Sequence, residues 1–219
     1  MDIEEQKFLW EKALDFGVEL SRQHLNLFSI YLDELIEWNL RINLTGLSSR
    51  KRMISELFLD SLIPAPLLPE KGRMLDVGSG AGFPGIPIKI YCPHIRTHLL
   101  EANSKKVSFL KQVIRLLKLD DIEVNKGRIE GSGTKLHTEY YHLITARALA
   151  SLNQTIAWCS PFLSPGGMLV TFMGNSAEKD LKHSRHIREA HSLIVYKSRS
   201  YLLPGKQSKR TIVIYKKRA

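Results

Sequence analysis

The fold class of this chain is specified by one stretch, Met74-Leu75-Asp76-Val77-Gly78-Ser79-Gly80-Ala81-Gly82-Phe83-Pro84-Gly85. A short apolar run ends in Asp76, three glycines follow at every second position, and a Pro/Gly-punctuated helix start comes next. Glycine adopts positive φ and lacks the Cβ that keeps a backbone away from a ligand. The stretch therefore predicts a strand followed by a loop whose backbone approaches a bound molecule closely.

An acidic residue lies where a nucleoside-binding domain needs one. Glu101 follows Gly78 by 23 positions and ends a second strand-like run, Thr97-His98-Leu99-Leu100-Glu101. In doubly wound α/β domains, a carboxylate about 20 residues after the glycine loop hydrogen-bonds the ribose hydroxyls. The two features together predict binding of an adenosine-containing cofactor.

The spacing of the glycines discriminates between such cofactors. Dinucleotide-binding loops read G-x-G-x-x-G. Here the loop reads G-x-G-x-G, and Phe83 stands at the third dinucleotide position. With Asp76 two residues before the first glycine, the pattern is typical of S-adenosylmethionine (SAM) methyltransferases. Two alternatives are a strand-to-helix turn without a ligand and a nicotinamide-dependent dehydrogenase on a similar fold.

Length and composition limit the class of protein. At 219 residues the chain can bury a sizeable core, and prolines near residue 66 separate a helical extension, residues 1–66, from a cofactor domain, residues 67–219. No apolar run approaches the ~20 residues of a membrane span, and no signal peptide is present. Cys92 and Cys159 form no C-x-x-C pair. We expect a cytoplasmic protein without a membrane contact. No exposed heptad repeat or additional apolar stripe indicates a protein partner, so we expect a monomer.

Charge is distributed unevenly along the chain. Residues 1–40 carry nine acids and three bases, a net charge of −6, whereas the whole chain carries +10, which leaves +16 for residues 41–219. The last thirty residues contain no acid. Such a basic body is typical of proteins that bind a polyanion, because phosphate contacts dominate affinity for nucleic acids. A lysine-rich surface that only maintains solubility is the alternative.

Helix-like and strand-like segments alternate after an all-helical start. Apolar residues at helical spacing from Leu25 to Leu35 predict an N-terminal helix that packs on the main domain. The later alternation predicts a Rossmann-like α/β fold, with a mainly parallel twisted sheet and helices on both faces. The expected strands are 73–78, 97–101, 121–125, 142–145, 168–173, 192–203 and 211–216.

Local signals predict how some connections are made. The basic turn Arg50-Lys51-Arg52 leads into a helix that ends before Pro64, and a helix from Ser151 is stopped by Ser164-Pro165-Gly166-Gly167. Gly131-Ser132-Gly133 is expected to form a loop. Ligands in such sheets bind at the carboxyl ends of the strands, so a single constellation is expected there, made of Gly78, Glu101, Arg128–Glu130 and Arg147.

Other candidate residues carry weaker signals. His183 and His186 lie three apart on a predicted polar helix and could together bind a metal ion. No set of Cys or carboxylate residues nearby would complete the coordination, so no metal site is expected. Trp38, Trp158 and Tyr91 could stack on bases. They lie in apolar periodic stretches and are interpreted as core residues.

Several motifs also follow one another in an order that is typical of one family. The specific one is the loop Asp76–Pro87 with its trailing Phe-Pro-Gly-Ile-Pro. The supporting ones are Trp38-Asn39, Ile42-Asn43-Leu44-Thr45, Leu59-Asp60-Ser61, Lys105-Lys106, Arg128-Ile129-Glu130 and Arg147-Ala148. From about residue 25 to the last strand, the chain resembles the bacterial 16S ribosomal RNA guanine-N7 methyltransferases (RsmG, formerly glucose-inhibited division protein B).

The resemblance implies where SAM binds. Asp76 belongs to the loop motif, and Gly78, Gly80 and Phe83 would border the methionine part of SAM. Glu101 would accept hydrogen bonds from the ribose hydroxyls.

The same resemblance places three further residues and a substrate. The Ile129 backbone and Glu130 would frame the adenine, and Arg147 would lie at the mouth of the site, near the cofactor and the incoming base. The implied partner is 16S rRNA or the small ribosomal subunit. Guanine N7 carries a free lone pair, so no general base is required and no catalytic residue is assigned.

Two positions depart from the family pattern. Leu57 stands where the family usually has His, and Met173 stands where it usually has Lys before a glycine. Both family residues are polar groups expected on the substrate side. An alternative function is therefore a SAM- and RNA-binding ribosome assembly factor with a degenerate substrate site.

Overall fold

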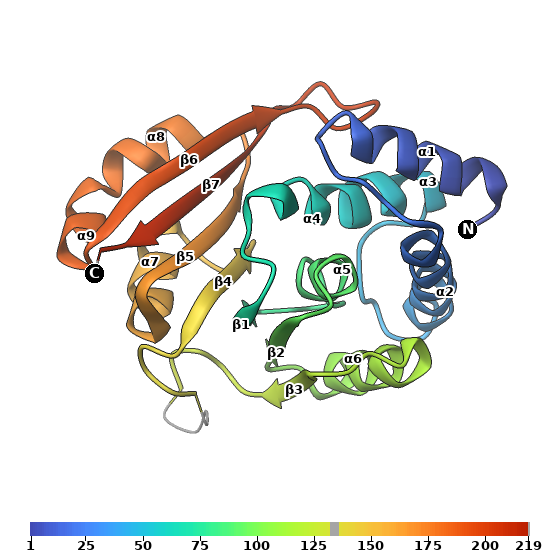
Figure 1. The fold of residues 1–219 in the computed structure, drawn as a ribbon, viewed down its shortest axis with the longest axis horizontal. Coiled ribbons are helices and arrows are strands. Elements are labelled where there is room, and N and C mark those ends of the chain that lie inside the picture. The colour runs from blue at the N-terminus through green and yellow to red at the C-terminus, as the bar shows by residue number, and fades with distance from the viewer. Residues whose placement is uncertain (132–135, 219) are drawn as a thin grey trace.

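A computed structural model describes residues 1–131 and 136–218, which contain a seven-stranded sheet (Figure 1). The strand order is β3-β2-β1-β4-β5-β7-β6; β1 to β5 are parallel, and β7 is antiparallel to both its neighbours. The expected α/β class with a mainly parallel sheet is confirmed. The strands are β1 (Gly72–Val77), β2 (Ile95–Glu101), β3 (Ile122–Lys126), β4 (Tyr141–Arg147), β5 (Leu163–Met173), β6 (Leu193–Tyr201) and β7 (Arg210–Lys217).

Helices lie on both faces of the sheet, and the N-terminal helices extend one of the two layers (Figure 1). Helix α2 contacts α5 and α6, which in turn pack on β2 and β3. No helix in the described residues is long and apolar enough to cross a membrane. The longer helices are α1 (Ile3–Leu14), α2 (Arg22–Asn39), α5 (Gly85–Tyr91), α6 (Ser104–Leu117), α7 (Leu152–Cys159), α8 (Ala177–His183) and α9 (Arg185–Ala190).

A continuous buried helix spans residues 50–62, with a π-helical middle. It consists of α3 (Arg50–Met53), the π-helical segment Ile54–Leu59 and α4 (Asp60–Leu62). The basic residues 50–52 form its first turn instead of a separate turn before it, because the Ser49 side chain caps the Arg52 N–H. Residues 53–62 are all buried, including the polar residues Ser55, Glu56, Asp60 and Ser61, so this part of the helix runs through the core.

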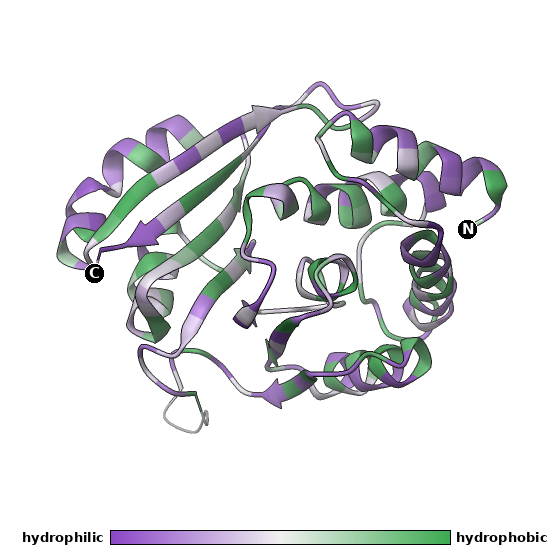
Figure 2. Cartoon of the chain, viewed as in Figure 1, coloured by the Kyte–Doolittle hydropathy of each residue, from purple (hydrophilic) through white to green (hydrophobic). Residues whose placement is uncertain are grey.

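Alternation along the strands divides the core into one cluster on each face of the sheet. Along β7, Ile212 and Ile214 pack on the face covered by α2, α5 and α6, whereas Val213 and Tyr215 pack with α7. The first cluster also contains residues from both sides of position 66. In Figure 2 much of β5 and the middle of β7 are hydrophobic, whereas the edge strand β6 is mixed and α8 and α9 are largely hydrophilic.

Two connections differ from the sequence-based predictions, and a third lies largely outside the described residues. Helix α7 ends at Cys159 and a 3₁₀ turn follows (Ser160–Phe162), so the Ser-Pro-Gly-Gly run belongs to β5. The register between β4 and β5 shifts between Tyr141 and Leu143, and this irregularity accommodates the proline and glycines. The predicted polar helix is two short helices that meet at Ser184. Of the expected loop at 131–133, Ser132 and Gly133 are outside the described residues.

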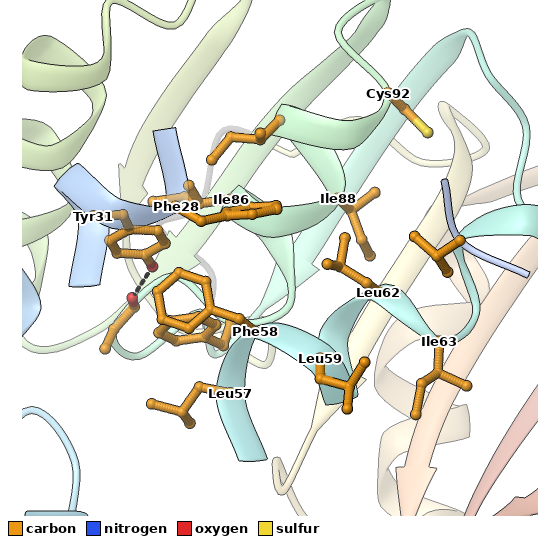
Figure 3. Packing of buried hydrophobic residues seen from close by; sticks show 14 of the residues in the cluster. Phe28, Tyr31, Leu57, Phe58, Leu59, Leu62, Ile63, Ile86, Ile88 and Cys92 are labelled. Atoms are coloured by element: carbon orange, nitrogen blue, oxygen red, sulfur yellow. Dashed lines mark hydrogen bonds between the residues drawn. The ribbon is translucent and has the colours of Figure 1, made fainter. Parts of the chain in front are cut away.

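An aromatic cluster anchors the glycine loop to the N-terminal helices. The Tyr31 hydroxyl of α2 donates a hydrogen bond to the Ala81 carbonyl, as Figure 3 shows. The Tyr31 ring stacks on Phe83 with centroids 5.1 Å apart and planes 4° apart, and Phe58 packs edge-on against both rings. Aromatic contacts of this kind stabilise beyond the area that they bury. The loop therefore takes its shape from residues of the first 66 positions as well as from the sheet.

Candidate active site

The glycine loop between β1 and α5 has the left-handed backbone that its sequence predicts. Gly78, Gly80 and Gly82 have φ values of +70°, +58° and +89°. A Cβ at Gly82 would lie 2.5 Å from the Tyr31 hydroxyl, so only glycine allows the loop and α2 to approach this closely. The N–H groups of Gly78 and Ser79 both donate to the Leu100 carbonyl, which fixes the loop on β2.

A cavity of about 220 Å³ opens beside this loop, at the carboxyl ends of β1 and β2. We call it the Glu101 pocket. Four of the predicted cofactor residues line it: Gly78, Glu101, Ile129 and Glu130. Trp158 lines it as well, although its apolar, periodic surroundings predict a core residue. Its place at the pocket depends on how α7 packs against the sheet, and no local sequence signal reports that.

Glu101 is positioned by two backbone donors. Its Oε2 accepts from the Gly80 N–H at 2.8 Å, and its Oε1 accepts from the Asn103 N–H at 2.7 Å. The carboxylate thus joins the glycine loop to the start of α6. Each oxygen keeps lone pairs for further donors, as a ribose diol would supply.

Asp76 lies behind the loop and does not line the pocket. Its Oδ1 accepts from the Thr145 hydroxyl at 2.6 Å, and its Oδ2 accepts from the Gly85 N–H at 3.3 Å. A Cβ at Gly85 would lie 2.7 Å from this carboxylate, which explains the glycine there. Complete burial raises the pKa of Asp76, whereas these hydrogen bonds lower it. Burial is the larger effect, and the resulting pKa is about 6. Asp76 therefore ties β1 to β4 and to the start of α5.

Phe83 is likewise a core residue. It is 7% exposed and packs between Tyr31 and Phe58, and it does not line the Glu101 pocket. Its position after the glycines determines how the loop enters α5. Asp76 and Phe83 thus support the loop from behind, while Gly78 and Glu101 face the cavity.

Arg147 does not join the constellation that its strand-end position predicts. Its Nη2 donates to the Glu56 carbonyl at 2.6 Å and lies 3.4 Å from Asp60 Oδ2, so the side chain meets the buried helix 50–62. Its Nη1 is buried and has no hydrogen-bond partner among the described residues. Arg147 thus forms a structural ion pair with Asp60. It lines a second cavity and not the Glu101 pocket.

The partner of Arg147, Asp60, is the centre of a buried ionic network that the sequence motif alone did not reveal. Asp60 is fully buried; its Oδ2 accepts from Arg210 Nη1 at 2.7 Å and its Oδ1 from the Tyr201 hydroxyl at 2.6 Å. Nearby, Glu56 pairs with Arg52 and Lys206. Burial raises the pKa of Glu56, but the hydrogen bonds and positive charges of Arg52 and Lys206 together lower it. The network joins residues more than 140 positions apart in the sequence.

Two further cavities continue the site along the ends of β4 and β5. The Asp180 pocket, about 180 Å³, shares Leu149 with the Glu101 pocket. The Arg147 pocket, about 440 Å³, shares Ala148 and Met173 with the Asp180 pocket. The Arg147 pocket is lined by polar and basic side chains near the ends of β4 and β5 and the start of β7: Arg147, Asn175, Ser208, Lys209 and Arg210. The three cavities form one row of sites, which is cationic at the Arg147 end.

The two departures from the family pattern lie in different surroundings. Met173 lines both the Asp180 and the Arg147 pockets, as expected for the substrate side. Leu57 belongs to the hydrophobic core on the π-helical segment and lines none of the three cavities, which differs from the expectation (Figure 3). An apolar residue at 57 is therefore consistent with its packing.

The raised pKa of Asp76 predicts a specific pH dependence of stability. Because the carboxyl binds its proton more tightly in the folded protein than at its ordinary pKa of 3.8, its contribution is present below about pH 4 and is lost as pH rises through about 6. Relative to Asp76→Asn, the wild type should gain up to about 3 kcal/mol of unfolding free energy between pH 7 and pH 4.

Urea denaturation of both proteins across this pH range measures the difference. Asp120→Asn, at an exposed position, is the matched control. A difference between wild type and Asp76→Asn that does not change with pH would contradict the assigned burial effect.

Comparison with known proteins identifies the family. Residues 24–211 match the family model "GidB: rRNA small subunit methyltransferase G". A "Ribosomal RNA small subunit methyltransferase G" of Acetivibrio thermocellus is 36% identical over 97% of this chain and 88% of its own length. The protein of the same name from Alkaliphilus metalliredigens is 36% identical over 84% of this chain and 78% of its own length.

Solved structures show the same fold at low sequence identity. A putative transferase from Pyrococcus horikoshii superposes with a TM-score of 0.60 at 11% identity, covering 73% of this chain and 63% of that one. TYW2 of M. jannaschii, solved in complex with AdoMet, superposes with a TM-score of 0.59 at 14% identity, covering 73% and 75%. The family match, and not this shared fold, excludes the dehydrogenase alternative. The chain belongs to the rRNA small subunit methyltransferase G family of SAM-dependent methyltransferases.

Proposed function

We propose that this protein, acting as a monomer in the cytoplasm, transfers the methyl group of SAM to N7 of one guanine in 16S small-subunit rRNA. The observation that carries the proposal is the family match over residues 24–211. The row of three cavities supports it, because the Asp180 pocket links the pocket beside the glycine loop to a cationic pocket whose charge suits RNA phosphates.

The Glu101 pocket suits the adenosine part of SAM. Glu101 offers free lone pairs to the ribose hydroxyls, and Ile129 and Glu130 border the space where the adenine would lie. A Cβ at Gly78 would lie 3.1 Å from the Leu149 side chain, and the φ of +70° also favours glycine at this end of the pocket. Gly78 and Gly80 would then face the methionine part, while Asp76 and Phe83 hold the loop from behind.

The chemistry requires little of the protein beyond placement. SAM supplies an electrophilic methyl group and its own leaving group, and guanine N7 attacks with a lone pair that carries no proton. The residues must hold N7 in line with the methyl group at near-attack distance, which is proximity catalysis. No side chain has to move a proton in the transfer step, and we assign none as a general base.

The deciding experiment is transfer of labelled methyl from SAM to small ribosomal subunits that lack the modification. Digestion and nucleoside chromatography should yield 7-methylguanosine as the labelled product. Absence of transfer, with SAM binding intact, would contradict the proposed activity and favour the assembly-factor alternative. Met173→Lys then distinguishes a substrate site that has lost its function from an enzyme that acts on a different RNA. Methyl transfer to the small subunit should appear in this variant only in the first case.

The placement of the ribose is tested by Glu101→Gln. The amide group of glutamine sets an N–H donor against the Gly80 or Asn103 N–H, so both the loop and the ribose contact are weakened. SAM affinity in a calorimetric titration should fall by about tenfold to a hundredfold.

Glu123→Gln, on β3 outside the Glu101 pocket, is the matched control for this titration. The melting midpoint without SAM reports whether the fold itself is affected. Wild-type affinity in Glu101→Gln would place the ribose elsewhere.

The RNA backbone is expected at the Arg147 pocket. Arg210 there is neutralised by Asp60 and Glu56, whereas Lys209 is exposed and forms no ion pair within residues 1–131 and 136–218. Lys209→Ala should therefore reduce by about 1 the slope of log affinity for rRNA against log salt concentration.

Lys111→Ala, an exposed charge on α6 away from the three cavities, is the control and should leave the slope closer to that of the wild type. Equal slopes for wild type and Lys209→Ala would place the phosphates on another face.

A further inference from the structure

The Asp180 pocket contains a carboxyl group that the proposed function has not used. Its other lining residues are apolar, small or hydroxyl-bearing, and Asp180 of α8 is the charged residue among them. The pocket lies between the other two cavities, since it shares Leu149 with the Glu101 pocket and Met173 with the Arg147 pocket. A base that meets the cofactor from the RNA side would occupy this position.

Asp180 differs from the other acids of the site in lacking a cation. Asp60 and Glu56 are each paired with Arg or Lys, and Glu101 accepts from two backbone N–H groups. Within the described residues, Asp180 has no salt bridge. Its Oδ2 accepts from the Ser176 hydroxyl at 2.7 Å, which orients the carboxylate and leaves Oδ1 and further lone pairs available.

An unpaired carboxylate beside an RNA site is unfavourable unless the substrate compensates for it, because it repels phosphates. The compensation has to come from hydrogen-bond donors on the substrate. Guanine carries two adjacent donors, N1–H and the exocyclic N2 amino group, on the edge that lies opposite N7. An ionised carboxylate accepts two such bonds at once.

We propose that Asp180 determines base specificity by accepting hydrogen bonds from N1–H and the N2 amino group of the target guanine in the Asp180 pocket. With these donors held at Asp180, N7 on the opposite edge of the purine faces the wall that the pocket shares with the cofactor site. Adenine presents an acceptor at N1, which the carboxylate repels. The inference rests on the proposed guanine-N7 methylation and extends it to the recognition of the base.

The test compares guanosine with inosine at the target position, located by mapping the wild-type product and introduced by ligation of synthetic rRNA fragments. Inosine keeps N7, O6 and N1–H but lacks the 2-amino group, so it removes one of the two proposed bonds. The wild type should prefer guanosine over inosine by about tenfold to a hundredfold in kcat/KM, the range for a hydrogen bond to a charged group. In Asp180→Asn, activity on guanosine should fall and the preference should approach onefold.

Glu178→Gln, an exposed acid on the same helix, is the matched control and should keep both the activity and the preference of the wild type. Unchanged SAM affinity in Asp180→Asn shows that the fold and the cofactor site are intact. Equal use of guanosine and inosine by the wild type, or an unreduced preference in Asp180→Asn, overturns the proposal. Absence of 7-methylguanosine with the wild type overturns the proposed function itself, so the two failures are distinguishable.

Discussion

The contact of Tyr31 with the glycine loop is the constraint on which the site depends. Its hydroxyl bonds the Ala81 carbonyl and its ring stacks on Phe83, so α2 holds the loop from the side opposite the cavity. Gly82 has to lack a Cβ for this approach. A buried carbonyl without this donor would carry the free-energy cost of an unmade hydrogen bond. The N-terminal helices therefore help to shape the glycine loop and are more than an appendage to the sheet.

Electrostatics divides the site into regions with separate tasks. Buried acids on the helix 50–62 neutralise Arg147 and Arg210 and hold them in place, whereas Lys209 at the same cavity has no ion pair within the described residues. Such pairs orient side chains more than they stabilise the fold, because burial of both charges costs solvation. In the neighbouring pocket the pattern is reversed, since Asp180 forms no salt bridge with any residue that the structure describes. Cationic and anionic contacts thus lie side by side, as recognition of both a phosphate backbone and a base requires.

The glycine loop and Glu101 could be predicted because both depend on local geometry and on their separation along the chain. Gly78, Glu101, Ile129 and Glu130 meet at one cavity, as expected from strand ends in a parallel sheet. Asp76 and Phe83 belong to the same motif yet face inward. A motif marks residues that a loop requires, whether they touch a ligand or support the backbone behind it.

The sequence by itself determined the α/β class, the mainly parallel sheet and the nature of the loop, because hydrophobic periodicity and glycine spacing are local properties. Tertiary structure decided the rest. Arg147 turns to Asp60, Trp158 reaches the cofactor cavity and Asp180 lines the middle pocket because helices from distant parts of the chain pack there. The direction of a side chain and the residues around it depend on contacts between parts of the chain that lie far apart in the sequence. No local sequence pattern contains this information.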